Sequence, residues 1–154
     1  MNEACEQLRL KNQLCYPVYL CAKELTRWYG TVLQELGLTY TQYIVMMYFW
    51  EQGSSNVREL GKALLLDSST LTPLLKKLEQ KGLLSRSRSS QDERNLIVTL
   101  TDAGRALQQA ALSVPQRACA CLGLSEAEAK TLYELTCKVL TNVEKEIETW
   151  QSSK

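Results

Sequence analysis

Two kinds of side chain in this sequence are able to do chemistry, and the first is the cysteine thiol. The chain has six cysteines and no histidine. Cys15 precedes Tyr19 by four residues, so on a helix the thiol and the phenol lie on one face. A phenol that donates to sulfur favours the nucleophilic thiolate, which is only a few per cent of a free thiol at neutral pH. Cys15 is therefore a candidate reactive thiol, although an arbitrary cysteine in a cytosolic helix is more often a packing residue.

Cys119 and Cys121 form the one closely spaced pair of thiols. A metal site there needs an all-thiolate ligand set, and a single pair is a weak signal, so we expect no metal. We expect the pair to lie in an irregular segment between the last two helices, where backbone freedom lets a thiol move. Cys21 and Cys137 fall on apolar helical faces, and we interpret them as packing residues.

The second chemical signal is a helix predicted between Asp67 and Gly82. Asp67 is a preferred N-cap residue, and a glycine commonly follows a helix end. One side of this helix is an apolar stripe of Leu71, Leu74, Leu75 and Leu78. The remaining face carries Ser68, Ser69, Thr70, Thr72, Lys76 and Lys77. Small hydroxyls and cations suit base edges and phosphates, so this face is a candidate DNA-reading surface.

A shorter helix precedes this one and a hairpin follows it. Asn56 is the predicted N-cap of the shorter helix, and Glu59 three residues later makes a variant of the capping box. After Gly82 the pattern changes to alternation, in LLSRSR and again in NLIVTL, which predicts two strands joined by a polar loop. The order is therefore helix, turn, helix and two-stranded wing.

Basic residues accompany the predicted wing. Arg86 and Arg88 are two residues apart, so they project from one face of the first strand, where a DNA groove can receive them. Asp92 and Arg94 flank the return, and this pair is expected to lock the hairpin while the Arg94 guanidinium faces a phosphate. A solvated helix pair with a charged surface hairpin is the alternative. The order of the four elements favours DNA binding.

Helices are predicted over nearly all of the remaining chain. Apolar residues recur at spacings of three and four from Leu14 to Leu36, and a second apolar helix covers 41–51. Another helix follows Thr101 and breaks around Pro115, and Ser125 with Glu128 makes a capping box for a last helix. That last helix carries an apolar seam of Leu132, Leu135, Val139, Leu140, Val143 and Ile147. We expect the seam to pack against the first helix and a partner chain.

Composition sets the class of protein. A chain of 154 residues with 45% apolar content is expected to make one domain, or a core completed by a second copy. The net charge is only +1, but residues 62–94 hold seven basic and four acidic side chains, whereas 124–154 hold four and six. We see no leader and no apolar run of membrane-spanning length, so we expect a cytoplasmic protein with reduced thiols, no membrane partner and no cofactor.

The order of elements resembles the multiple-antibiotic-resistance-regulator (MarR) family of dimeric repressors over nearly the whole chain. Within that family, several strings are similar to the organic-hydroperoxide-resistance regulator branch: KNQLCYPVYLCAKELTRWY, LTYTQYIVMMYFWE, LDSSTLTPLLKKLE and DERNLIVTLT. The resemblance implies a mainly α fold, with a winged helix-turn-helix at about 41–101. Helices at about 8–37 and 102–151 would form the dimerisation region of a single 1–154 domain.

The resemblance also assigns roles to residues. Cys15 would be the peroxide sensor, with Tyr19 and Tyr29 in its hydrogen-bonding surroundings. Residues 68–77 would enter the major groove of operator DNA, and Arg86 and Arg94 would make wing and phosphate contacts. In branch members with a second reactive cysteine, that cysteine falls near Cys119 and Cys121 and forms a disulfide between subunits. The sequence does not choose between the two.

Spacing tests the role of Tyr29 independently. Tyr29 is fourteen residues after Cys15, or roughly 21 Å along one helix, so the two cannot touch within a chain. Antiparallel crossing of two first helices in a homodimer would bring Tyr29 of one chain to Cys15 of the other. Together with this spacing, the resemblance implies a homodimeric repressor that leaves its operator when an organic hydroperoxide oxidises Cys15. The alternatives are a repressor released by a small aromatic ligand and, from another class, a thiol peroxidase enzyme.

Overall fold

The computed structural model describes residues 6–88 and 96–153, and the chain divides into two compact units, Met1–Leu112 and Ser113–Lys154. Asp92 and Arg94, the predicted wing lock, lie outside the described residues. The prediction that both units belong to one domain stays a prediction.

The first unit holds the winged helix-turn-helix and the first long helix. Its elements in chain order are η1 (Leu10–Asn12), α2 (Cys15–Val32), η2 (Leu33–Leu36), α3 (Tyr40–Gln52), β1 (Ser54–Asn56), α4 (Val57–Leu64), α5 (Ser68–Gln80), β2 (Leu84–Arg88), β3 (Leu96–Leu100) and α6 (Asp102–Ala111). The predicted helices and the two wing strands are confirmed. The fold of this unit is mainly helical with one small sheet.

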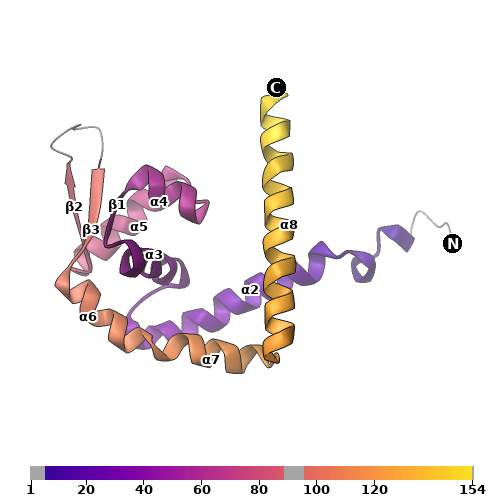
Figure 1. The fold of residues 1–154 in the computed structure, drawn as a ribbon, viewed down its shortest axis with the longest axis horizontal. Helices are drawn as coiled ribbons and strands as arrows, with labels where there is room; N and C mark the ends of the chain where they lie inside the picture. Colours follow the sequence, from indigo (N-terminus) through magenta and orange to yellow (C-terminus); the bar gives the residue numbers. More distant parts are fainter. Residues whose placement is uncertain (1–5, 89–95, 154) are drawn as a thin grey trace. The chain divides into compact units, whose positions relative to one another are not determined.

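The sheet has three antiparallel strands in the order β1-β3-β2 (Figure 1). Strand β2 pairs with β3 from Leu84 opposite Leu100 to Arg88 opposite Leu96. Strand β1 pairs with the other edge of β3, with Ser55 opposite Val98. We did not predict β1, because three polar residues are too few to show alternation. It joins the start of α4 to the wing.

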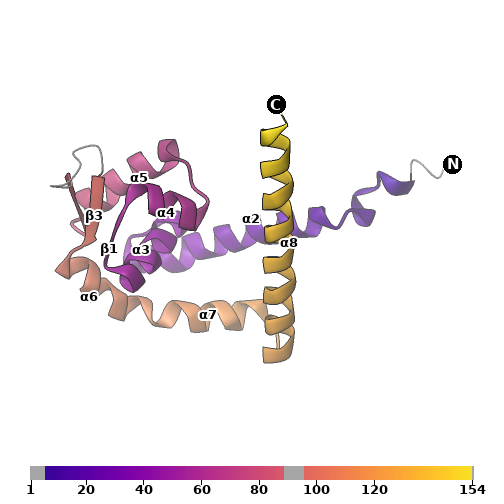
Figure 2. The same cartoon turned by 45° about the horizontal axis from the view of Figure 1, so that its top comes forward.

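The core of this unit lies between α3, α4, α5 and the sheet, which stay together in both views of the ribbon (Figures 1 and 2). The predicted leucine stripe of α5 is buried, and it shares the core with Met46 and Phe49 of α3, Leu60 of α4 and Val98 of β3. Burial of one α5 face leaves the opposite face in solvent.

The predicted N-caps of the two central helices are present. The Asn56 side chain accepts from the Glu59 backbone N–H at 2.8 Å, and Asp67 Oδ1 accepts from the Thr70 N–H at 2.7 Å. The predicted capping box of α4 is only half correct, because the Glu59 carboxylate accepts instead from the Ser55 hydroxyl, at 3.1 Å. That bond ties α4 to strand β1.

The second unit consists of α7 (Ser113–Leu122) and α8 (Glu126–Ser152). The predicted capping box of α8, between Ser125 and Glu128, is confirmed. The predicted irregular segment is wrong, because Cys119 and Cys121 lie within α7. Pro115 falls in the first turn of α7, where a missing N–H breaks no hydrogen bond, so it starts a helix instead of preventing one.

Within residues 6–88 and 96–153, every helix is too short or too polar to cross a lipid bilayer.

We predict that Gly104→Ala lowers the free energy of unfolding by roughly 1–3 kcal/mol, through overpacking. A Cβ at this position in α6 would lie 2.3 Å from the Leu83 carbonyl oxygen and 2.7 Å from Leu100 Cδ1. Gly30→Ala in α2 is the control, because its Cβ has no described atom within 4 Å outside its helix neighbourhood. Urea denaturation measures both. An unchanged midpoint for Gly104→Ala would contradict the packing described here.

Candidate functional site

The polar face of α5 is accessible along its whole length. All six predicted residues of this face are exposed: Ser68, Ser69, Thr70, Thr72, Lys76 and Lys77. Two of the hydroxyls also order the helix, since Ser69 donates to Asp67 Oδ1 at 2.6 Å and Thr72 donates to the Ser68 carbonyl at 2.7 Å. The face is therefore a set of hydrogen-bonding groups and cations held on a capped helix.

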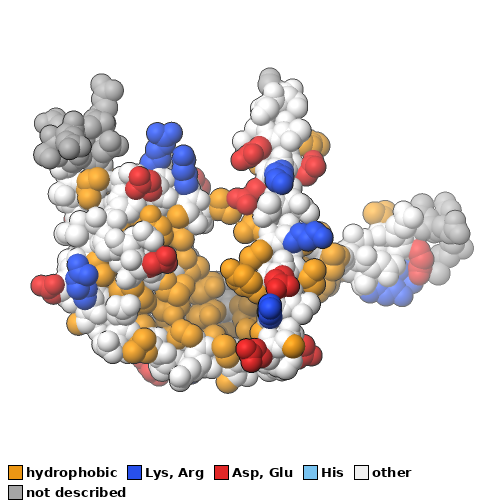
Figure 3. Space-filling model, in the orientation of Figure 1, with side chains coloured by type: hydrophobic (Ala, Val, Ile, Leu, Met, Phe, Trp, Pro, Cys, Tyr) orange, Lys and Arg blue, Asp and Glu red, His pale blue; other side chains and the backbone are white. Residues whose placement is uncertain are grey.

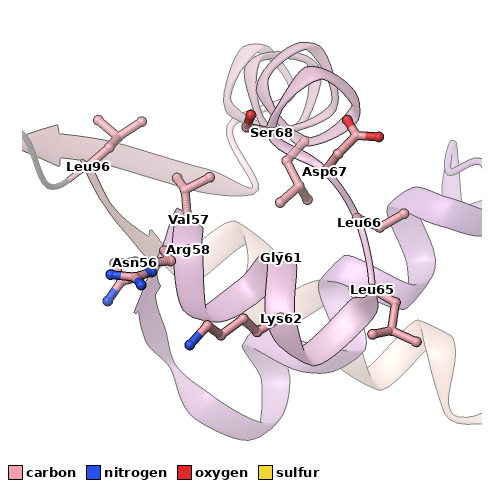
Figure 4. A pocket seen from close by; sticks show the side chains of 11 residues that line it. Asn56, Val57, Arg58, Gly61, Lys62, Leu65, Leu66, Asp67, Ser68 and Leu96 are labelled. Atoms are coloured by element: carbon pink, nitrogen blue, oxygen red, sulfur yellow. The ribbon is translucent and has the colours of Figure 1, made fainter. Parts of the chain in front are cut away.

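A groove of about 650 Å³ borders the start of α5 (Figure 4). Val57 of α4, Leu71 of α5 and Leu96 of β3 give it apolar walls. Figure 4 shows Arg58 and Lys62 projecting from the same side of α4, and Asp67 and Ser68 at the start of α5. The groove therefore separates a cationic helix from the polar face of α5.

The turn between α4 and α5 is tight. Leu65 has a left-handed backbone with φ 52°, which is rare for a leucine. A Cβ at Gly61 would lie only 2.8 Å from the Leu66 carbonyl oxygen, so the turn passes directly over α4 at this glycine. Close approach of the turn sets the angle at which α5 leaves α4.

The two described arginines of the wing differ in their surroundings. Arg88 is exposed at the end of β2, whereas Arg86 is partly buried and forms an ion pair with Glu79 of α5. We did not predict Glu79 as the partner of Arg86. The alternation of side chains along β2 could have indicated a partner for Arg86, because Leu84, Arg86 and Arg88 share a face of the strand and Leu84 is buried.

The predicted thiol site is distributed along α2. Cys15 is the first residue of this helix and is exposed, and Tyr19 on the next turn is 62% exposed. Tyr29 lies on the same helix near its other end, so the structure does not bring it to Cys15 of its own chain. The described cysteines are free thiols on the surface: Cys15, Cys21, Cys119, Cys121 and Cys137. Among all residues that the structure describes, no three potential metal ligands lie together.

An aromatic cluster surrounds Tyr29. Its ring stacks on Tyr40 of α3, with centroids 4.2 Å apart and planes at 16°, and Tyr43 lies 6.2 Å from it. Tyr43 contacts Trp50 edge-on, and the Trp50 indole N–H donates to the Gly104 carbonyl at 2.8 Å. Burial raises the pKa of Tyr40, and burial followed by the neighbouring Tyr40 raises the pKa of Tyr43. Both phenols stay protonated at neutral pH.

The apolar seam of α8 is uncovered. Its six predicted residues are each about half exposed: Leu132, Leu135, Val139, Leu140, Val143 and Ile147. Hydrophobic side chains appear along much of α8 in the space-filling view (Figure 3). An apolar surface of this extent on a charged helix indicates an interface for another protein surface.

Comparison with known proteins finds relatives along nearly the whole chain. The family described as transcriptional regulator SarA/Rot matches residues 27–111. The organic hydroperoxide resistance transcriptional regulator of Bacillus subtilis is 38% identical, over 94% of this chain and 96% of that protein. Reduced AbfR bound to DNA, from Staphylococcus epidermidis, matches with a TM-score of 0.75 and 37% identity, over 91% of this chain and 98% of that one. Disulfide-formed AbfR matches with a TM-score of 0.64 and 36% identity, over 96% and 98%.

The fold and these likenesses define a winged-helix transcriptional regulator. The chain belongs to the SarA/Rot family of transcriptional regulators, and its predicted place in the MarR family, with the organic-hydroperoxide-resistance regulators, is confirmed.

We predict that the cap of α5 makes stability depend on pH in acid. The Ser69 hydroxyl, and then the Thr70 backbone N–H, lower the pKa of Asp67. A carboxyl whose pKa is lower in the folded state stabilises that state above its usual pKa, and this contribution is lost as pH falls through the lowered value. Asp67→Asn keeps a capping oxygen but does not titrate, so its free energy of unfolding should fall less steeply below about pH 4.

Urea denaturation at several pH values measures this dependence. Asp102→Asn is the matched control, because Asp102 is an exposed carboxylate in the first turn of α6. The same acid slope for the native chain and Asp67→Asn would contradict the role of the Asp67 carboxylate.

Proposed function

We propose that this chain is a homodimeric repressor that binds operator DNA and leaves it when an organic hydroperoxide oxidises Cys15. The observation that carries the proposal is the exposed polar face of α5 beside a basic wing, on a chain whose α2 begins with an exposed thiol. The family supports it as well, since a relative is named for organic hydroperoxide resistance and another is described in reduced, DNA-bound form.

In the proposed complex the two α5 helices enter successive major grooves about 34–36 Å apart. Hydroxyls near the start of α5 read base edges, while Lys76 and Lys77 contact phosphates. Arg88 and Arg94 of each wing add positive charge, and Asp92 supports the hairpin. Four such cations from each of two chains imply a steep loss of affinity with salt.

The proposed sensor forms only in the dimer. Antiparallel crossing of two α2 helices brings Tyr29 of one chain to Cys15 of the other, while Tyr19 flanks the thiol from its own helix. Stacking on Tyr40 supports this assignment, because it restricts the orientation of the Tyr29 ring. A phenol donating to the Cys15 sulfur favours the thiolate.

The proposed chemistry is a two-step oxidation. The Cys15 thiolate attacks the O–O bond, the alkoxide leaves and takes up a proton as the alcohol, and Cys15 becomes a sulfenic acid. A second thiol then attacks this sulfur, which forms a disulfide and releases water. Cys119 and Cys121 remain the candidate resolving residues, now on a helix instead of a loop, and a small cellular thiol is the third candidate.

We predict that hydroperoxide weakens operator binding only when Cys15 is present. A short DNA duplex that binds the native chain is first selected from a random library. Reduced native protein and reduced Cys15→Ser should bind this duplex with equal affinity. After cumene hydroperoxide, native affinity should fall by about 5- to 150-fold, the usual size of allosteric coupling, whereas Cys15→Ser should be unaffected. Fluorescence anisotropy measures both.

Cys21→Ser is the control, because Cys21 is an exposed thiol on the same helix and should leave the response intact. Peptide mapping on non-reducing gels then identifies the partner of Cys15 as Cys119, Cys121 or a small thiol. Equal release of Cys15→Ser would overturn the sensor assignment. Ligand-dependent release without oxidation would favour an aromatic ligand, and sustained turnover of peroxide with a reductant would favour a peroxidase.

We predict that Tyr29→Phe slows alkylation of Cys15 at neutral pH and moves the midpoint of rate against pH upward. The variant loses the hydroxyl donor but keeps the ring that stacks on Tyr40, so operator binding by the reduced form should hardly change. Tyr16→Phe is the matched control, because Tyr16 is a partly exposed phenol of α2 next to Cys15 in sequence. Native alkylation kinetics in Tyr29→Phe would remove Tyr29 from the mechanism.

A further inference from the structure

Strand β2 is an edge strand, and its outer edge is held by one residue of α5. Among the described strands, the order β1-β3-β2 leaves one side of β2 without a strand partner. The backbone N–H of Arg86 on that side donates to Glu79 Oε1 at 3.2 Å. Glu79 lies in the last turn of α5, so the carboxylate joins the end of this helix to the wing.

The same carboxylate also binds the Arg86 side chain. Arg86 Nε and Nη2 donate to Glu79 Oε2 at 2.9 and 2.6 Å. The two side chains are 22% and 35% exposed, so the pair is partly shielded from water. With three donors on one carboxylate, this contact is more ordered than the usual surface ion pair. The Arg86 hydrogen bond also lowers the pKa of Glu79, which keeps the carboxylate charged.

Position along β2 explains why this contact matters. Leu84, Arg86 and Arg88 point to one face of the strand, in the order buried, partly buried and exposed. Leu84 packs in the core at the foot of the wing, and the Arg86 ion pair is the next contact outward. The ion pair therefore joins α5 to the part of β2 that lies beyond the core.

We propose that Glu79 is a positioning residue for the wing, and that Arg86 acts as a strut between α5 and β2 instead of as a separate phosphate ligand. This inference rests on the proposed DNA-binding function, and it replaces the phosphate contact that family resemblance assigns to Arg86. With its guanidinium held on Glu79, Arg86 fixes the direction in which Arg88 meets DNA.

The two roles predict opposite effects of Glu79→Gln. A phosphate-binding Arg86 would be released, and a negative charge near DNA would disappear, so binding would tighten. A strut would lose its charged partner, so specific binding should weaken by about tenfold. Glu51→Gln is the matched control, because it makes the same charge change at an exposed site at the end of α3.

Salt dependence separates the two arginines. Arg88→Gln removes a phosphate contact, so the slope of log affinity against log salt should fall by about one unit for each chain. Arg86→Gln should weaken binding to the selected duplex without changing that slope. The double variant Glu79→Arg with Arg86→Glu reverses the ion pair, and it should recover part of the lost affinity.

These measurements use the full chain, the selected duplex and a scrambled duplex, with circular dichroism melting to verify folding. Hydrogen exchange gives a readout without DNA, because the Arg86 amide should exchange faster in Glu79→Ala, which removes the acceptor, and not in Glu51→Ala. Glu79→Gln binding as tightly as the native chain, or native protection of the Arg86 amide in Glu79→Ala, would overturn the strut. Failure of the native chain to bind any duplex would overturn the proposed function itself.

Discussion

The proposed dimer depends on burial of the apolar seam of α8. This helix has 27 residues and none of them is buried in the described chain, although leucine, valine and isoleucine recur along it. A helix gains most of its stability from packing an apolar face, so a second surface has to cover this one. In the proposed dimer that surface is another copy of the chain. The proposed sensor requires the same dimer, because Tyr29 cannot reach Cys15 within one chain.

Much of the fold was predictable because its signals are local. Caps at Asn56 and Asp67 and the leucine stripe of α5 depend on residues within a few positions of each other. Non-local features were missed. Strand β1 is defined by its partner β3 and not by its own three residues. Pro115 was interpreted as a helix breaker, whereas in the first turn of α7 its missing N–H has no consequence. Cys119 and Cys121 therefore lie on a helix and not in the predicted loop.

The candidate sites divide in the same way. The types and exposure of the α5 residues followed from periodicity, but which groups already have partners did not. Arg86 faced a groove in the sequence interpretation, and Glu79 of α5 binds it in the structure. Tyr29 was linked only to Cys15, yet its ring belongs to an aromatic cluster that runs through Tyr43 to Trp50 and ends on the Gly104 carbonyl. The contacts of this cluster therefore link α2 through α3 to α6.

Two carboxylates lie at the ends of α5, and the negative charge of each is repelled by DNA phosphates. Asp67 and Glu79 each place a negative charge on the helix proposed to enter the groove, and hydrogen-bond donors lower the pKa of both. Coulomb repulsion from DNA disfavours such charges. What they provide is orientation, since Asp67 orders the first turn through Ser69 and Thr70, and Glu79 holds the wing through Arg86. Lys76, Lys77 and Arg88 remain exposed between and beyond these two contacts. In the proposed DNA interface, these two carboxylates therefore reduce the electrostatic attraction, but they orient the remaining cations toward the DNA backbone.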